Sequence, residues 1–552
     1  MVRSAVAIAL LLASTSAAAI APGFKAKADA LLADAYAATG PGAAVIITEN
    51  GQTVYAAGRG MADVEKKIAI TPDTHFRIGS ITKQFTAAAI LKLTEQGKLS
   101  LDDPLSKFLP NYPAPGSSAT VRQLLNHTSG VMPYTNIPGF MVEANINKPY
   151  TTEQLIAVFK DIPSPSKPGE KWNYNNSGYV LLGAILEKVT GKSWDQAVGD
   201  LVTGPLKLTT IRSGIGIDGT AGMAAGYSDE EGKMVPATKI HMSVPHGAGA
   251  LVGNVGDLAT WGQALHHGKV VAPASYAAMI SPTTTADGKI EPYGFGLQTG
   301  DIRGRREIGH GGGINGFSTD SLFLPEQQIF VAVFANSDSP RIATSVVARK
   351  LAALAVGDAY PTFTKAAIDP KTLGPAFGVY DFGSAKRTFF ARDAKLFMQR
   401  EGGPALEVFS AGSNRFFYGP ESLSWFELVG APGATRQIAF YGEGASKPVT
   451  GSRTGPPPVE SAAVSVPAAT LATYVGSYTS AAGTFVFKHE GDGLTVKLGA
   501  QPAFPLKATS VTEFEIAQVG ARIRFNVKDG KAASITLFQG GQELEGVRQP
   551  QP

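Results

Sequence analysis

The spacing of apolar residues changes near residue 360, and this change constrains the fold more than any other feature of the chain. Upstream, apolar residues follow both helical and strand spacing, whereas downstream a period-two alternation dominates, as in 395–399. Such alternation is typical of half-buried antiparallel strands. A proline-rich linker, 447–467, divides the alternating region. The sequence therefore predicts an α+β domain followed by two small antiparallel β modules, each barrel-like, at 365–450 and 468–552.

The region 20–360 is predicted to form one domain, with strands at both ends and helices between them. The Asn50-Gly51 pair predicts a tight hairpin between the first two strands. Because the strands come from distant parts of the chain, we expect one antiparallel sheet flanked by helices. The expected helices are 24–37, 81–96, 178–189 and 341–355, and the expected strands are 43–48, 53–58, 302–308, 318–323 and 329–335.

The N-terminal segment has the pattern of a secretory signal. Arg3 supplies a positive charge, residues 5–12 are apolar, and small residues continue to Ala19. The apolar run is too short to cross a bilayer, and no later run reaches the ~18 apolar residues that a span needs. Residues 1–19 are therefore predicted to be a signal peptide, and the protein to be periplasmic or extracellular without a membrane span. The alternative is an N-terminal helix of the fold.

Composition narrows the classes of partner and cofactor. The chain of 552 residues has a net charge of only +4 and no run of basic residues, so no nucleic acid partner is expected. It contains no cysteine, which excludes disulfides and thiolate metal sites. No cofactor and no metal is expected, and the predicted partner is a small molecule or a short peptide substrate.

A hydroxyl and an amine lie three residues apart in Ser80-Ile81-Thr82-Lys83, at the predicted start of a helix. Residues i and i+3 share one face of a helix, so the amine can take the serine proton if its pKa is lowered. Burial and the positive end of the helix dipole both act in that direction. The pattern predicts Ser80 as the nucleophile of an acyl transfer and Lys83 as its base. The alternative is a solvated helix start without chemistry.

A second pattern, Tyr174-Asn175-Asn176, directly precedes a helix that Ser177 is expected to cap. A tyrosine whose phenolate is stabilised by nearby cations can act as a general base, so Tyr174 is a candidate catalytic residue. The amide of Asn176 is suited to orienting a substrate. The alternative is a buried tyrosine with a satisfied hydroxyl.

A third pattern, His310-Gly311-Gly312-Gly313, follows a predicted strand. Glycines at this place allow a substrate backbone to lie against the strand. The backbone amide of Gly313 is a candidate partner for that of Ser80 in an oxyanion hole. His310 is expected beside the hydroxyl as a polar, partly cationic group. The alternative is a glycine-rich turn with an incidental histidine.

In this order, the three patterns resemble the motifs of the penicillin-recognising serine hydrolases. That family includes class C β-lactamases, D,D-carboxypeptidases, D-aminopeptidases and β-lactamase-fold esterases. The resemblance covers roughly residues 25–355. Further stretches that resemble the family are Phe76-Arg77-Ile78-Gly79, Leu124-Leu125-Asn126-His127-Thr128-Ser129-Gly130, Gly178-Tyr179-Val180-Leu181-Leu182-Gly183, Gly249-Ala250-Leu251, Asp257-Leu258-Ala259 and Tyr293-Gly294-Phe295-Gly296.

The resemblance implies a β-lactamase/transpeptidase-like fold and a set of roles. Ser80 would attack the carbonyl and become acylated, while Lys83 and Tyr174 share the proton transfers. Substrate binding would fall to Asn176, His310, Gly312 and Gly313, with the backbone amides of Ser80 and Gly313 holding the oxyanion. His310 stands where many relatives carry the lysine of a Lys-Thr-Gly motif.

The resemblance also implies a class of substrate. A histidine with an ordinary pKa is mostly neutral at pH 7 and suits a substrate carboxylate less well than a lysine does, which makes penicillin hydrolysis a less expected main activity. Arg303, Arg305 and Arg306 are either carboxylate ligands or solvated strand-edge charges. The layout is similar to that of D-aminopeptidases, so we expect an exported hydrolase of D-amino-acid-containing peptides or amides. The alternatives are a carboxylesterase, a β-lactamase and a non-catalytic protein that binds peptidoglycan fragments.

Overall fold

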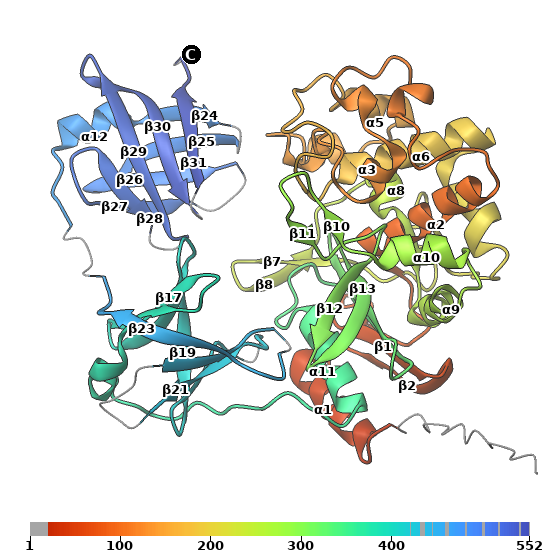
Figure 1. Cartoon of the computed structure of the whole chain (residues 1–552), viewed down its shortest axis with the longest axis horizontal. Helices are drawn as coiled ribbons and strands as arrows, with labels where there is room; N and C mark the ends of the chain where they lie inside the picture. Colours follow the sequence, from red (N-terminus) through yellow and green to blue (C-terminus); the bar gives the residue numbers. More distant parts are fainter. Residues whose placement is uncertain are drawn as a thin grey trace, which may run out of the picture.

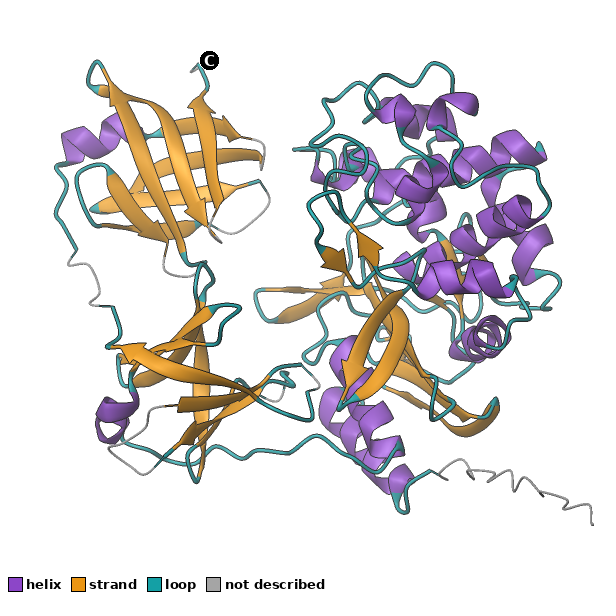
Figure 2. Cartoon of the chain, in the orientation of Figure 1, coloured by secondary structure: helices purple, strands orange, loops and turns teal. Residues whose placement is uncertain are grey.

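An N-terminal α+β domain is followed by two β-barrels in the computed structural model (Figure 1), which confirms the predicted fold class. Helices are concentrated in the N-terminal domain, whereas the rest of the chain is mainly strand (Figure 2). The predicted signal segment 1–19 lies outside the described residues. The structure describes residues 20–419, 421–430, 437–443, 445–458, 463–480, 483–499, 503–516, 519–539 and 542–550.

A six-stranded antiparallel sheet in the order β12-β13-β14-β15-β1-β2 forms the centre of the N-terminal domain. As predicted, the sheet combines the first and last parts of the domain: β1, near its start, pairs with β15, near its end. The hairpin turn lies at Asn50-Gly51, where both residues have a positive φ, as the tightest hairpin turns require. The strands are β1 (Ala43–Glu49), β2 (Gln52–Arg59), β12 (Gln298–Ile302), β13 (Arg305–Ile314), β14 (Phe317–Leu324) and β15 (Ile329–Ala335).

Each face of this sheet is covered by helices and has its own apolar core. On one face, α1 (Phe24–Ala35) and α11 (Thr344–Ala355) pack on alternate residues of the strands, including Leu322 and Leu324. On the other face lies the larger core, built around α2 (Thr82–Glu95) and its neighbouring helices. Because side chains alternate along a strand, odd and even positions of β13 face different cores.

The helical region lies between β2 and β12 in sequence. None of its helices, nor any other described helix, combines the length and apolarity needed to cross a membrane. The remaining helices are α3 (Val121–Leu125), α4 (Glu143–Ile146), α5 (Thr152–Ala157), α6 (Asn176–Thr190), α7 (Trp194–Val198), α8 (His246–Gly249), α9 (Val255–His266) and α10 (Pro273–Ile280). Short strands accompany them: β3 (Met61–Asp63), β4 (Ile68–Ala69), β5 (Phe76–Arg77), β6 (Arg212–Ser213), β7 (Tyr227–Glu230), β8 (Lys233–Pro236), β9 (Leu251–Gly253), β10 (Thr283–Thr284) and β11 (Ile290–Glu291).

Two local predictions were wrong. Helix α6 begins at Asn176, and its cap is Asn175, whose side-chain oxygen accepts from the backbone N–H of Gly178 at 3.1 Å. Ser177 lies inside the helix, and its hydroxyl accepts instead from the backbone N–H of Tyr134. The expected strand 302–308 is two strands, β12 and β13, and β13 continues through the glycine-rich segment to Ile314 because β14 pairs with it along that whole length.

The two barrels share a set of contacts that supports an internal repeat. Each begins with a Gly-x-Tyr sequence, and the tyrosine hydroxyl donates to the backbone carbonyl four residues earlier (Tyr380 to Ala376, Tyr478 to Tyr474). In each, an arginine of the last strand donates to the carbonyl that precedes the first strand: Arg453 to Phe377, and Arg548 to Val475. These contacts close both barrels in the same way.

Both barrels have eight antiparallel strands, the first paired with the last. A short helical segment precedes each: the 3-10 helix Pro370–Ala376 and helix α12 (Ala468–Tyr474). The first barrel contains β16 (Gly378–Asp381), β17 (Lys386–Arg392), β18 (Lys395–Arg400), β19 (Ala405–Gly412), β20 (Arg415–Phe417), β21 (Trp425–Val429), β22 (Gln437–Tyr441) and β23 (Val449–Gly455). The second contains β24 (Gly476–Ser480), β25 (Gly483–Glu490), β26 (Gly493–Leu498), β27 (Phe504–Ala508), β28 (Glu513–Ile516), β29 (Ala521–Lys528), β30 (Lys531–Gln539) and β31 (Gln542–Arg548).

The loop after β22 brings the first barrel against the N-terminal domain. Glu443 lies 3.6 Å from the Arg349 guanidinium of α11. Ser446 lies beside the turn between β12 and β13, close enough that a Cβ on Gly304 would be 3.0 Å from its hydroxyl. The first barrel therefore contacts the same helix and hairpin that border the candidate site described next.

Candidate active site

Ser80 lies in a single 3-10 turn, Gly79–Ile81, that leads directly into α2. The turn preserves the three-residue spacing of the predicted pair, and the Lys83 Nζ lies 3.0 Å from the Ser80 Oγ. Lys83 is completely buried, which is unusual for a lysine and requires that its amine be fully hydrogen-bonded. The other two contacts of the Nζ are the side-chain oxygen of Asn176 and the backbone carbonyl of Ala248, both at 2.8 Å.

The burial of Lys83 favours a neutral amine that can take a proton. Burial lowers the pKa of Lys83 well below its ordinary value. Carbonyl oxygens only accept hydrogen bonds, so Asn176 and Ala248 take the two N–H groups of a neutral amine. The remaining lone pair is then available to the Ser80 hydroxyl, which can donate. Lys83 thus has the geometry of the base that activates Ser80.

Tyr174 is hydrogen-bonded to Ser80, and both residues line one cavity. Burial raises the pKa of Tyr174, and the hydrogen bond with Ser80 offsets only part of that rise. The Lys83 Nζ lies 4.8 Å from the centre of the tyrosine ring. The expectation of a stabilised phenolate was therefore wrong: the resting tyrosine is a protonated phenol, suited to passing a proton rather than to extracting the first one.

The segment 173–176 is held in place by His127 and by the start of α6. The backbone N–H of Asn175 donates to the His127 Nδ1 at 3.1 Å, and the N–H of Asn173 donates to the His127 carbonyl. The imidazole packs on the Tyr174 ring, with the ring centres 4.5 Å apart. His127 has a positive φ of 66°, so its backbone makes the bend that brings these contacts together. Its role is to position Tyr174 and Asn176.

Strand β13 approaches the Ser80 turn so closely that only glycine fits at two positions. A Cβ on Gly312 would lie 2.1 Å from the Ile78 carbonyl oxygen, and a Cβ on Gly79 would lie 2.9 Å from the Gly313 nitrogen. Gly79 also has a positive φ of 51°, which glycine adopts without strain. The backbones of Ser80 and Gly313 are consequently brought together, as an oxyanion hole made from their amides requires.

His310 lies in β13 and faces the cavity beside Ser80 and Tyr174. Its Nδ1 lies 2.6 Å from the Gly311 carbonyl and must carry the proton, while its Nε2 accepts from the Tyr293 hydroxyl at 2.9 Å. Burial lowers the pKa of His310 to about 3. The expected partly cationic character was therefore wrong, and the imidazole is a neutral, fixed group.

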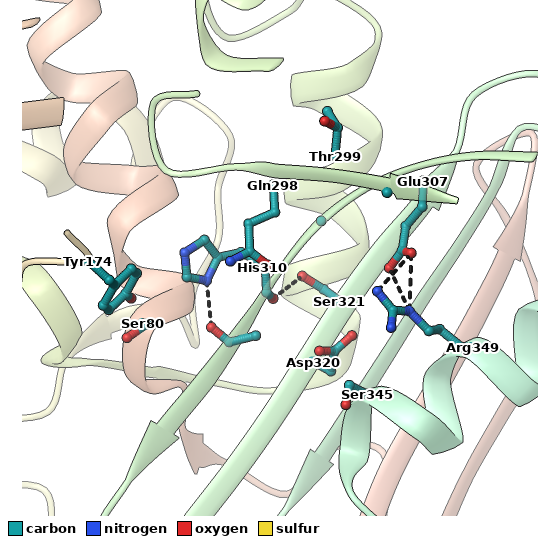
Figure 3. Close-up of a pocket in the computed structure, with 13 residues that line it drawn as sticks. Ser80, Tyr174, Gln298, Thr299, Glu307, His310, Asp320, Ser321, Ser345 and Arg349 are labelled. Atoms are coloured by element: carbon teal, nitrogen blue, oxygen red, sulfur yellow. Dashed lines mark hydrogen bonds and ion pairs between the residues drawn. The ribbon is translucent and has the colours of Figure 1, made fainter. Parts of the chain in front are cut away.

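The structure brings together every residue that the three sequence patterns supplied, and it adds a cavity that the sequence did not reveal. Ser80, Tyr174 and His310 lie at one end of this cavity of about 450 Å³ (Figure 3). Glu307, Asp320 and Arg349 line its remainder, along with Gln298, Thr299, Gly300, Gly309, Gly311, Ser321 and Ser345. The one available signal was Asp320, the only charged residue of its strand, which shares a strand face with the buried Leu322 and Leu324.

The three arginines upstream of His310 do not line the cavity. Arg303 and Arg305 both bind the Asp358 carboxylate, at 2.8 Å each. Arg306 is exposed on β13. The carboxylate role considered for them has no support in this geometry, whereas Arg349 of α11 does line the cavity.

Comparison with known proteins identifies the family. The family model described as Beta-lactamase matches residues 28–355, so the chain belongs to the beta-lactamase family. Within it, the chain is a serine hydrolase related to peptidases. Among the described residues, no group of three or more His, Asp or Glu side chains is arranged to hold a metal ion.

Two relatives and one solved structure illustrate the similarity. Penicillin-binding protein 4* of Bacillus subtilis is 25% identical over 73% of this chain and 93% of its own length. The D-aminopeptidase of Brucella ovis is 29% identical over 54% of this chain and 56% of its own, so the match spans about half of that relative. The octameric penicillin-binding protein homologue from Pyrococcus abyssi shares the fold across 95% of this chain and 99% of its own, with a TM-score of 0.53 and 22% identity.

Proposed function

We propose that this protein hydrolyses amides or peptides of D-amino acids through an acyl-enzyme on Ser80. The observation that carries the nucleophile assignment is the buried Lys83 amine, 3.0 Å from the Ser80 hydroxyl, with its other two contacts taken by carbonyl oxygens. The choice of D-amino acids is supported by the similarity to the D-aminopeptidase of Brucella ovis. A neutral His310 supports it further, since the site offers no fixed cation there for the carboxylate of a penicillin.

The first half-reaction follows from the contacts. As the Ser80 oxygen attacks the substrate carbonyl carbon, its proton passes to the Lys83 nitrogen. The carbonyl oxygen becomes an anion, which the backbone amides of Ser80 and Gly313 stabilise. Tyr174 then gives its phenolic proton to the leaving nitrogen and is reprotonated from Lys83. The C–N bond breaks, the amine leaves, and an ester to Ser80 remains.

The second half-reaction repeats these steps with water. Water attacks the ester carbonyl and loses a proton to the pair formed by Lys83 and Tyr174. The same amides stabilise the second oxyanion, and the Ser80 oxygen leaves and recovers its proton. The product is the free acid, and all the residues return to their starting protonation states.

A substrate panel on one preparation tests this function. We expect turnover of D-alanine p-nitroanilide to exceed that of L-alanine p-nitroanilide, p-nitrophenyl acetate and nitrocefin in kcat/KM. Preference for the short ester would instead assign a carboxylesterase, and preference for nitrocefin a β-lactamase. Absence of both a burst and steady turnover with every compound would contradict the enzymatic proposal and favour a binding protein.

We propose in addition that the protein is exported, on the basis of the pattern of residues 1–19. Expression of the full chain in a Gram-negative host, followed by fractionation and N-terminal sequencing, tests this. Mature protein that begins near residue 20 in the periplasm or medium is the expected result. Full-length protein retained in the cytoplasm would contradict the proposal.

A further inference from the structure

The cavity described above extends from Ser80 to the face of the sheet that α11 covers (Figure 3). Positions 307, 309 and 311 of β13 all line it, as expected for alternate residues of one strand face. Two of these are glycines, but they differ: the missing side chain of Gly311 leaves space beside Asp320, whereas a Cβ on Gly309 would lie 2.2 Å from the Ser321 carbonyl oxygen of β14. Gly311 pairs with Asp320 of β14, and a Cβ on Gly311 would lie 3.1 Å from an Asp320 carboxylate oxygen.

The charged groups of this cavity are unevenly paired. Arg349 binds Glu307, with two guanidinium nitrogens each 3.1 Å from the same carboxylate oxygen. Its remaining nitrogen faces Glu443 of the first barrel at 3.6 Å. The one guanidinium is therefore shared between two carboxylates. Among the described residues, no hydrogen bond or ion pair reaches the carboxyl group of Asp320, which is partly buried and lines the cavity.

Burying a carboxylate that has no hydrogen-bond partner costs free energy, and a ligand that donates hydrogen bonds to it would offset that cost. An anionic ligand would be repelled, because the cavity carries two carboxylates, Glu307 and Asp320, against one guanidinium. Ser321 and Ser345 supply further hydroxyl oxygens to the lining. Oxygen acceptors around an unpaired carboxylate match a primary ammonium, which has three N–H donors and no acceptor.

We propose that Asp320 forms the base of a subsite for a protonated amine on the leaving-group side of the substrate. The inference rests on the proposed function, because it assumes that an amine leaves from an acyl group on Ser80. The leaving nitrogen must lie beside Tyr174, and Tyr174 lines this cavity, so the leaving group extends into it. Asp320 lies well away from Ser80 (Figure 3), so the ammonium is remote from the scissile bond. The preferred substrates are thus amides whose leaving group is a diamine or a basic amino acid.

The ionisation of Asp320 makes this preference depend on pH. Burial, with a further contribution from Glu307, raises the pKa of Asp320 to about 7, while Arg349 acts in the opposite direction. Burial likewise raises the pKa of Glu307, which Arg349 partly offsets and Asp301 and Glu443 add to. His310, the remaining titratable neighbour on β13, stays neutral in this range. The preference for substrates whose leaving group carries an ammonium is therefore expected to rise as the pH increases through 7.

Two matched amides test the subsite. D-alanine joined to one nitrogen of 1,4-diaminobutane and D-alanine pentylamide have nearly the same shape, but only the first has a terminal ammonium. Both release D-alanine, which a coupled D-amino-acid oxidase assay measures. We expect wild-type kcat/KM to favour the diamine amide by about 10- to 100-fold, the usual range for a hydrogen-bonded charge pair.

Variants assign this preference to Asp320. Asp320→Asn should remove most of the preference and its pH dependence, whereas Glu326→Gln should retain both, because Glu326 is an exposed acid beyond the same strand. Equal kcat/KM for the two amides in the wild type, or an unchanged preference in Asp320→Asn, would overturn the subsite.

A binding measurement separates this inference from the proposed function. Calorimetry with N-acetyl-1,4-diaminobutane and with N-pentylacetamide, of which only the first carries an ammonium, requires no turnover and no substituted chain. Tighter binding of the acetylated diamine by the wild type supports the subsite even if neither D-alanine amide is hydrolysed, in which case only the proposed function fails. Equal or absent binding of the two compounds overturns the subsite even if both D-alanine amides are hydrolysed.

Discussion

Replacing Gly312 with alanine is a direct test of how β13 places the oxyanion hole. The added Cβ would lie 2.1 Å from the Ile78 carbonyl oxygen and 2.4 Å from the Thr319 hydroxyl, whereas ordinary contacts begin near 3.4 Å. Strand and turn must therefore separate by more than about 1 Å, because the first clash is with backbone and no side chain can rotate away. Gly313 moves with the strand, and its amide leaves the position opposite Ser80.

We expect Gly312→Ala to lower kcat by about 10²- to 10³-fold, the usual effect of losing one oxyanion donor. Overpacking should also lower the free energy of unfolding by about 1–3 kcal/mol. The assay is steady-state hydrolysis of the best substrate in the panel, with calorimetric unfolding in parallel. Gly313→Ala is the matched control for stability, because its Cβ would meet nothing within 4 Å.

The reasoning would be refuted by a Gly312→Ala variant with the wild-type kcat and Tm. It would also be refuted if Gly313→Ala lost as much stability as Gly312→Ala, since the loss would then reflect glycine content rather than the close approach. If Gly312→Ala is too unstable to assay, Gly79→Ala provides a second test of the same close approach. That substitution acts from the Ser80 side of the same contact, where a Cβ would lie 2.9 Å from the Gly313 nitrogen.

Three further predictions concern the nucleophile, its base and the border of the cavity. Ser80→Ala should abolish turnover and labelling by a serine-directed phosphonate at an unchanged Tm; persistent labelling would assign another nucleophile. Lys83→Met should lower kcat/KM by about 10²- to 10⁴-fold. Wild-type activity should rise with pH through a pKa below the ordinary lysine value of 10.5, because burial favours the neutral amine, and the variant should lack this rise. Burial raises the pKa of Asp358, but hydrogen bonds from Arg305 and Arg303 outweigh this effect, so the pKa is lowered overall. The ion pairs of Asp358 therefore stabilise the fold fully above the pKa that Asp358 has in the unfolded chain, and this stabilisation is lost in acid. Asp358→Asn should therefore reduce the unfolding free energy at pH 7 by about 1 kcal/mol and have little effect below pH ~3, as followed by urea titration at both pH values; equal losses at the two pH values would contradict the ion-pair explanation.

The parts of the site that depend on local geometry could be predicted from the sequence. Ser80 and Lys83 are one turn apart, and any helical conformation brings them to one face, so a 3-10 turn in place of the first α-helical turn changed nothing essential. Tyr174 and Asn176 are likewise fixed by the start of α6. The cap itself was misassigned, because Asn175 and Ser177 are both good capping residues and only the contact of Ser177 with Tyr134 separates them.

The parts that depend on pairing between distant segments could not be predicted. Three consecutive glycines have a low strand propensity, and β13 continues through them only because β14 supplies the partners from Ser321 to Phe317. The neutral state of His310 depends on its burial by distant segments, and the partners of Arg349 come from β13 and from the first barrel. No local pattern in the sequence predicts which residues become these neighbours.

The contact between Glu443 and Arg349 gives the first barrel an electrostatic role at a distance from Ser80. Loss of Glu443 would leave the guanidinium with one carboxylate and make it a stronger competitor for Asp320. The cavity would then become less attractive to cations, although no atom of the nucleophile or its base had changed. Sequence changes in a barrel loop can therefore retune which molecules the protein accepts while leaving the bond-breaking residues intact.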